Sequence, residues 1–93
     1  MEAELRERIE RAAAVLKSFG ATEVYVFGSA ATGKMHEGSD VDMAVVGLPA
    51  KVYFRALYDA GNALGRDLDL INLEQDNLFT RYLRTKGRLQ RVA

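Results

Sequence analysis

Residues 23–46 read EVYVFGSAATGKMHEGSDVDMAVV and hold two apolar runs joined by a polar, glycine-containing segment. The first run, 23–27, is β-branched and aromatic, which favours a short strand with both faces buried. The second run, roughly 40–46, predicts another strand in which Asp40 and Asp42 share a face, because side chains alternate with a period of two. Paired carboxylates at the start of a strand indicate a site for a hard cation such as Mg²⁺, although Asp-x-Asp alone also fits a loop cap and a structural ion pair.

The Gly28-Ser29 pair lies between the first strand and a short predicted helix. Backbone N–H groups and a hydroxyl at such a turn can bind an anion, so the pair indicates a phosphate site. Ser29 taken alone also fits a simple helix cap. A catalytic triad of Ser29 with His36, the only histidine, is disfavoured because His36 lies in a polar loop. The stretch 28–34 lacks the Gly-Lys-Ser/Thr ending of a P-loop, which argues against an ATPase of that class.

A third carboxylate strengthens the metal hypothesis. Asp69 interrupts the apolar run 68–73, which predicts a third strand, and Asp67 falls on the same face two residues earlier. If the third strand lies beside the second, Asp69 joins Asp40 and Asp42, and three carboxylates could hold two divalent ions roughly 3.5–4 Å apart. We prefer Asp69 to Asp67 as the third carboxylate because it lies between two leucines inside the strand, but the sequence leaves both open.

The remaining segments predict helices. Apolar residues recur at helical spacing over 5–19 and over 49–64, with Pro49 at the first helical position. A last helix is expected over 76–86, with Asp76 as its N-cap. The alternation of helices and strands predicts a small sheet covered by helices, in an α/β or α+β arrangement.

Composition sets limits on the kind of protein. The chain has 93 residues, 48% of them hydrophobic, with one proline and no cysteine. We therefore expect a single folded domain over residues 1–93 without disulfide bonds. No apolar run is long enough to cross a bilayer, and the acidic amino terminus does not resemble a secretory signal, so we expect a cytoplasmic protein with no membrane partner. The formal net charge of zero argues against long nucleic acids as substrates.

The basic residues are concentrated near the carboxyl end. Five of them follow the last acid, Asp76, and these are Arg81, Arg84, Lys86, Arg88 and Arg91. Such a segment fits a solvated helix face, and it also fits a surface that docks an acidic partner.

Three motifs taken together resemble the minimal nucleotidyltransferases of the DNA polymerase beta superfamily. They are FGSAATG at 27–33, GSDVDMAV at 38–45 and LDLI at 68–71. The resemblance implies a polymerase-beta-like core, a small mixed sheet flanked by helices. Members of about this length include antitoxins paired with HEPN toxins, which are understood to transfer AMP from ATP to a tyrosine of the toxin. The resemblance thus implies a nucleotidyltransferase that modifies a partner protein.

The resemblance also implies a role for each motif residue. Gly28 and Ser29 would hold the triphosphate of ATP, the substrate. Asp40 and Asp42 would ligate two Mg²⁺ ions, and Asp69 would complete the metal site near the attacking hydroxyl. One metal ion would lower the pKa of that hydroxyl, and the other would neutralise the leaving pyrophosphate.

One departure from the family pattern keeps alternatives open. The chain has Thr32 where an arginine often follows the small residues of the first motif. A non-catalytic module that neutralises a toxin sterically is therefore one alternative, and a small-molecule nucleotidyltransferase working in a dimer cleft is another. The nucleotide base, the acceptor and the oligomeric state, including a homo-oligomer, are not determined by the sequence.

Overall fold

The computed structural model describes residues 3–33 and 40–93. A four-stranded sheet with the order β3-β2-β1-β4 forms its centre. β1 pairs antiparallel with both β2 and β4, whereas β3 pairs parallel with β2, so the sheet is mixed, as the fold class predicted. The strands are β1 (Glu23–Phe27), β2 (Val41–Val46), β3 (Leu68–Asn72) and β4 (Gln90–Arg91).

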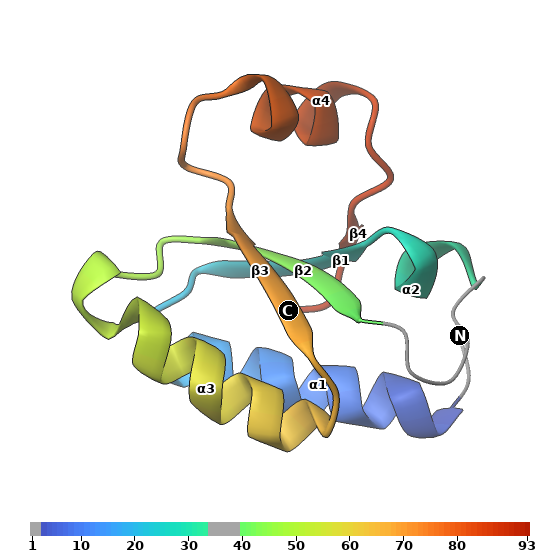
Figure 1. The fold of residues 1–93 in the computed structure, drawn as a ribbon, viewed down its shortest axis with the longest axis vertical. Helices are drawn as coiled ribbons and strands as arrows, with labels where there is room; N and C mark the ends of the chain where they lie inside the picture. Colours follow the sequence, from blue (N-terminus) through green and yellow to red (C-terminus); the bar gives the residue numbers. More distant parts are fainter. Residues whose placement is uncertain (1–2, 34–39) are drawn as a thin grey trace.

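Helices cover the two faces of the sheet unequally (Figure 1). The elements are α1 (Ala3–Ser18), α2 (Ser29–Thr32), α3 (Tyr53–Leu64) and α4 (Leu78–Thr85), with a 3₁₀ turn, η1 (Ala50–Val52), before α3. α1 and α3 lie side by side on one face, and α4 lies alone on the other (Figure 1). α3 also forms the crossover that the parallel pair β2–β3 requires.

The main core lies between the sheet and the pair of helices α1 and α3. On α3, Ala56, Ala60 and Leu64 recur every four residues and are buried, so small side chains face α1 and allow close packing. From β2, the side chains of Val41, Met43 and Val45 enter this core. The alternation of the strand therefore turns Asp42 toward the opposite face, as the sequence predicted.

A smaller apolar cluster lies on the α4 face of the sheet and consists of Phe27, Ala44, Leu73 and Leu83. Only Leu83 of this cluster comes from α4. Phe79, at the beginning of α4, packs edge-on against Phe27 with ring centroids 6.1 Å apart. α4 is thus held on the sheet by few apolar contacts, next to the end of β1.

Two predicted helix boundaries were wrong. Pro49 does not open α3, because it precedes η1 as its N-cap and α3 begins only at Tyr53. Asp76 is not the N-cap of α4, because Asn77 fills that position: its side chain accepts from the backbone N–H of Thr80 at 2.9 Å, and the Thr80 hydroxyl accepts from the backbone N–H of Asn77 at 3.1 Å. Asp76 instead forms an ion pair with Arg81.

The strand β4 was not expected from the sequence. Its two residues are exposed and polar, but the backbone continues the sheet where Val92 donates to the carbonyl of Val24 at 2.8 Å. Among residues 3–33 and 40–93, no helix has the length and apolar character needed to cross a membrane.

Candidate functional site

The parallel pairing of β2 and β3 brings two of the predicted acids together. In this register Asp42 lies directly opposite Asp69, whereas Asp67 precedes β3. Asp67 enters the pairing through its backbone carbonyl, which accepts from the N–H of Val41 at 3.0 Å. Asp40 is exposed and directly precedes β2. The register therefore joins Asp69 to the Asp-Val-Asp motif and leaves Asp67 at the preceding turn.

The surroundings of Asp42 disfavour its negatively charged form. Partial burial is the largest cause that raises the pKa of Asp42 above its ordinary value. The negative charges of Asp69 and Asp40 raise that pKa further, and so does a side-chain hydrogen bond with Asp69. All four causes act in the same direction, so the folded protein concentrates negative charge at this point of the sheet.

Gly28 brings the backbone of the first motif against the same carboxylate. Its φ of +68° is a conformation that other residues rarely adopt, and an added Cβ would lie 2.4 Å from Oδ2 of Asp42. This closeness follows from the register of β1 and β2, in which Phe27 pairs with Asp42. Any side chain at position 28 would therefore occupy the space of the Asp42 carboxylate.

α2 starts at this close approach. The N–H groups of Ala31 and Thr32 donate to the carbonyl of Gly28, each at 3.2 Å. The N–H groups of Ser29 and Ala30 belong to the first helical turn, where no acceptor within the helix exists. Such N–H groups beside the acidic pair are suited to an anion that brings its own cations.

The side chain of Thr32 is engaged within α2. Its hydroxyl lies 3.3 Å from the carbonyl oxygens of both Gly28 and Ser29, to which it can donate. Thr32 therefore supports the turn, and no contact of its hydroxyl outside α2 is found within the described part of the chain. Lys34, His36, Gly38 and Ser39, which the motifs and their loop include, lie outside the described residues.

The donor set fits Mg²⁺ in its usual protein coordination. Among residues 3–33 and 40–93, no three carboxylate or histidine side chains are gathered closely enough to hold an ion by themselves. Mg²⁺ is usually bound through one or two carboxylates and completes its octahedron with water and substrate phosphates. Asp42 and Asp69 supply such a pair of oxygen ligands, and a cation would offset the repulsion that raises the pKa of Asp42.

Phe79 is a neighbour of this site that the sequence did not indicate. It contacts Phe27, which pairs with Asp42 and lies on the same face of the sheet. The only available signal was the four-residue spacing of Phe79 and Leu83 on the last helix, which predicts a shared face but not its location over the site.

Comparison with known families identifies the fold. Residues 10–89 match the family described as Polymerase beta, Nucleotidyltransferase. The chain belongs to this nucleotidyltransferase family. The match spans all three sequence motifs and confirms the resemblance drawn from them. A comparison with curated proteins finds no match.

Solved structures agree with this assignment. A protein described as a minimal nucleotidyltransferase is 26% identical and superimposes with a TM-score of 0.75, with 95% of each chain covered. A toxin–antitoxin structure with AMP-PNP is 24% identical, with a TM-score of 0.73 over 90% of this chain and 72% of that chain. A complex of tri-AMPylated Shewanella oneidensis HEPN toxin with MNT antitoxin gives 17% identity and a TM-score of 0.70, covering 96% of this chain and 71% of that chain. The two toxin–antitoxin structures share the fold of this nucleotidyltransferase.

Proposed function

We propose that the chain is a Mg²⁺-dependent nucleotidyltransferase that moves AMP from ATP to a hydroxyl of a partner protein, and that it acts as the antitoxin of a HEPN-type toxin. The observation that carries this proposal is the Asp42–Asp69 pair, in which Asp42 lies against Gly28, the N-cap of α2. Carboxylates for a cation then meet, at one place, N–H groups that have no acceptor within α2 and could bind phosphate. The similarity to toxin–antitoxin structures, one with AMP-PNP and one with an AMPylated toxin, supports the choice of nucleotide and partner.

Each motif residue receives a role in this reaction. Gly28 and Ser29 bind the triphosphate through backbone N–H groups, and the small size of Gly28 lets the phosphates approach Asp42. Asp40 and Asp42, together with Asp69, would hold Mg²⁺, which would neutralise charge on the phosphates and lower the pKa of the attacking hydroxyl. Asp69, opposite Asp42, would complete the site near the attacking hydroxyl. The hydroxyl loses its proton to solvent and its oxygen forms a bond to the α-phosphorus, while the bond from the α-phosphorus to the α,β-bridging oxygen breaks and pyrophosphate leaves with that electron pair.

Labelled ATP tests the proposal. The purified protein, Mg²⁺ and α-labelled ATP are incubated with the protein encoded beside it, the expected HEPN-type partner, and label on that protein is measured. We expect wild-type transfer, and a loss of at least about 10²-fold in Asp42→Asn. Asp67→Asn is the matched control, because this exposed carboxylate lies two residues before Asp69 without facing Asp42. The catalytic proposal fails if no label is transferred or if Asp42→Asn transfers as well as the control.

Thr32 favours a second candidate function. Family members often carry an arginine at this position, and that cation could bind the triphosphate. In this chain the Thr32 hydroxyl instead lies near carbonyl oxygens at the start of α2 and supplies no positive charge. A module that binds the toxin and blocks it sterically would need no such cation. This alternative predicts that Asp40→Ala and Asp69→Ala still protect cells from the toxin, whereas the transferase predicts loss of protection.

A further inference from the structure

α4 presents an apolar surface to solvent. Leu78 is 84% exposed and Tyr82 is 55% exposed, and the two lie one helical turn apart on the same face. Phe79 is 47% exposed although it contacts Phe27. Large apolar side chains grouped in this way on a small protein indicate an interaction surface.

The same segment has a strongly one-sided charge. All thirteen acids of the chain lie at or before Asp76, and five cations but no acids follow it. Three of these cations have partners: Arg81 pairs with Asp76, Arg84 donates to the carbonyl of Leu73, and Arg91 pairs with Glu23. Lys86 and Arg88 are exposed and have no such partner among the described residues. A positive border therefore adjoins the apolar face of α4.

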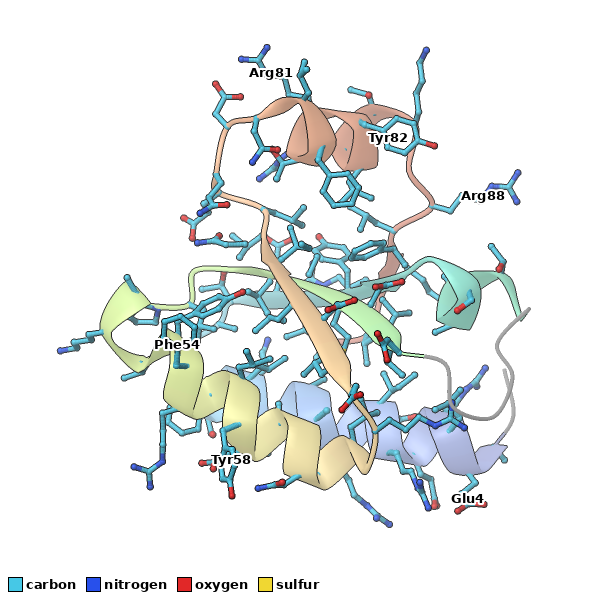
Figure 2. All side chains as sticks on the ribbon, viewed as in Figure 1. Glu4, Phe54, Tyr58, Arg81, Tyr82 and Arg88 are labelled. Carbon is cyan, nitrogen blue, oxygen red and sulfur yellow. The ribbon has the colours of Figure 1, made fainter. Side chains whose placement is uncertain are left out.

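The α4 surface, defined here as Leu78, Tyr82, Lys86 and Arg88, lies on the side of the sheet that carries the acidic pair. Figure 2 shows Tyr82 and Arg88 on this side, with Phe54 and Tyr58 on the opposite, helical side. Phe79 connects the two regions, since it contacts Phe27, the cross-strand partner of Asp42. A protein bound to α4 is therefore held on the same side of the sheet as the site of the proposed reaction.

We propose that the α4 surface docks the acceptor protein, and that the acceptor offers an apolar pocket bordered by carboxylates. The proposal rests on the proposed function, because it assigns the partner of that reaction to a surface. The exposed apolar side chains fill the pocket, and Lys86 and Arg88 meet the carboxylates at its border. Interfaces of this composition derive most of their affinity from a few central apolar residues and their selectivity from the charged rim.

Two other occupants fit less well. A nucleic acid is bound through about 6–10 phosphate contacts in typical cases, far more than the two cations without partners. A second copy of this chain could offer exposed Asp67 and Asp69, but these lie at the edge that carries the proposed reaction site. Glu4 and Glu7 on α1 already pair with Arg8 and Arg11. An acidic partner protein is the occupant that complements both the charge and the apolar character.

The experiment compares two pairs of exposed apolar residues. The double variant Leu78→Ser/Tyr82→Ser removes the apolar part of the α4 surface, and Phe54→Ser/Tyr58→Ser is the matched control on α3, where the two residues are 79% and 68% exposed. Binding to the HEPN-type protein is measured by titration calorimetry, and AMP transfer is measured against acceptor concentration. We expect the α4 variant to weaken Kd and raise the acceptor KM about tenfold. Its kcat and its thermal stabilisation by MgATP stay at the wild-type level, and the control binds as the wild type does.

A charge variant gives an independent test that does not touch an apolar residue. Lys86→Glu/Arg88→Glu should weaken binding at low salt and reverse the salt effect of the rim, because both residues are exposed and added salt then screens a repulsion. Circular dichroism establishes that each variant is folded. If Leu78→Ser/Tyr82→Ser unfolds, the charge variant still decides the question.

The outcomes separate the docking surface from the reaction. Binding that is lost in the α4 variants, together with no transfer by the wild type, supports the docking surface and refutes the reaction. An unchanged Kd in the α4 variants, or equal weakening in the α3 control, overturns the docking surface even when transfer is robust. Absence of wild-type binding also overturns it. Two further results would overturn the docking surface. In the first, the wild type sediments as a dimer and the α4 variant as a monomer. In the second, an RNA oligonucleotide binds the wild type but not the α4 variant.

Discussion

Gly28 controls the distance between the backbone of the first motif and the carboxylate of Asp42. Its backbone combines φ +68° with ψ −145°, a region that is almost exclusive to glycine, and the missing side chain leaves room for Oδ2. Gly33 also has a positive φ, +75°, but an added Cβ there meets nothing within 4 Å. Substitutions at the two glycines therefore allow the effect of backbone strain to be measured apart from the effect of a contact with Asp42.

Gly28→Ala should abolish transfer, while Gly33→Ala should retain it. Both substitutions should lower the free energy of unfolding, because alanine disfavours a positive φ. We expect a loss of about 1–3 kcal/mol at position 28 and about 1–2 kcal/mol at position 33. Only Gly28→Ala displaces the Asp42 carboxylate. Denaturant unfolding and the labelled-ATP assay measure the two effects, and equal activity of the two variants would contradict the proposed role of Gly28.

Asp42 should reduce stability at neutral pH in the absence of divalent cations. The pKa of this carboxyl is raised in the folded protein, so the folded state binds its proton more tightly than the unfolded state does. Stability is therefore lost as pH rises from the ordinary carboxyl range through the raised pKa. At pH 7 we expect Asp42→Asn to be more stable than the wild type, and this difference should vanish at a pH below the ordinary range of the carboxyl pKa.

Chemical unfolding in chelator at several pH values measures this difference. Asp67→Asn should show no such gain, because Asp67 lies at the turn before β3 and not opposite Asp42. A gain of equal size in both variants would mean that general charge reduction, and not the acidic pair, is responsible.

At the scale of the element, α4 depends on its capping residues. It has eight residues, fewer than the roughly 12–15 that an isolated helix needs, and the Asn77–Thr80 capping box satisfies two N–H groups at its start. Thr80 is buried and its hydroxyl donates to the carbonyl of Gln75 at 2.6 Å. We expect Asn77→Ala to cost about 1 kcal/mol in thermal or denaturant unfolding.

Asp76→Ala is the control for this prediction. The two residues are adjacent and both are common N-caps, but Asp76 only forms an exposed ion pair with Arg81. Its replacement should change the unfolding midpoint little. A larger loss in Asp76→Ala than in Asn77→Ala would mean that the helix starts one residue earlier than described.

The elements that the sequence predicted well are those whose signals are local. The strand 23–27 was predicted with its observed bounds, because a β-branched run stops at a glycine with a positive φ. The sequence predicted that Asp42 and Asp69 lie together only if their two strands are neighbours. This pairing joins strands that lie far apart in the sequence, so no local signal reveals it. β4 could not be predicted, because its two polar residues become a strand only through backbone hydrogen bonds that β1 offers.

At the scale of the whole molecule, the two faces of the sheet differ in how firmly they are covered. The main core under α1 and α3 contains most of the buried side chains, including Leu16, whereas the cluster under α4 contains four, including Leu83. Regions with few buried contacts open without global unfolding. The face that carries the acidic pair is therefore the face with the weaker cover.

Native-state hydrogen exchange should resolve this difference. Amides of α4 are expected to exchange through an opening of lower free energy and weaker denaturant dependence than amides of α1. Leu83→Ala should lower protection in α4 alone. Leu16→Ala should destabilise the whole molecule by about 2–5 kcal/mol and lower protection everywhere. Identical opening energies for α1 and α4 would show one cooperative unit instead.

The pairing of β3 with β2 alone has a consequence for solubility. Within the described residues no strand pairs with the outer side of β3, although the carbonyls of Leu70 and Asn72 on that side already accept hydrogen bonds from the Tyr53 hydroxyl and the N–H of Gln75. Exposed Asp69 and Asp67 place charge along that edge, a common protection against strand-to-strand aggregation. Asp69→Val should therefore cause concentration-dependent light scattering that Asp69→Lys does not. We therefore expect the carboxylate that we assign to the reaction to protect the protein from aggregation as well.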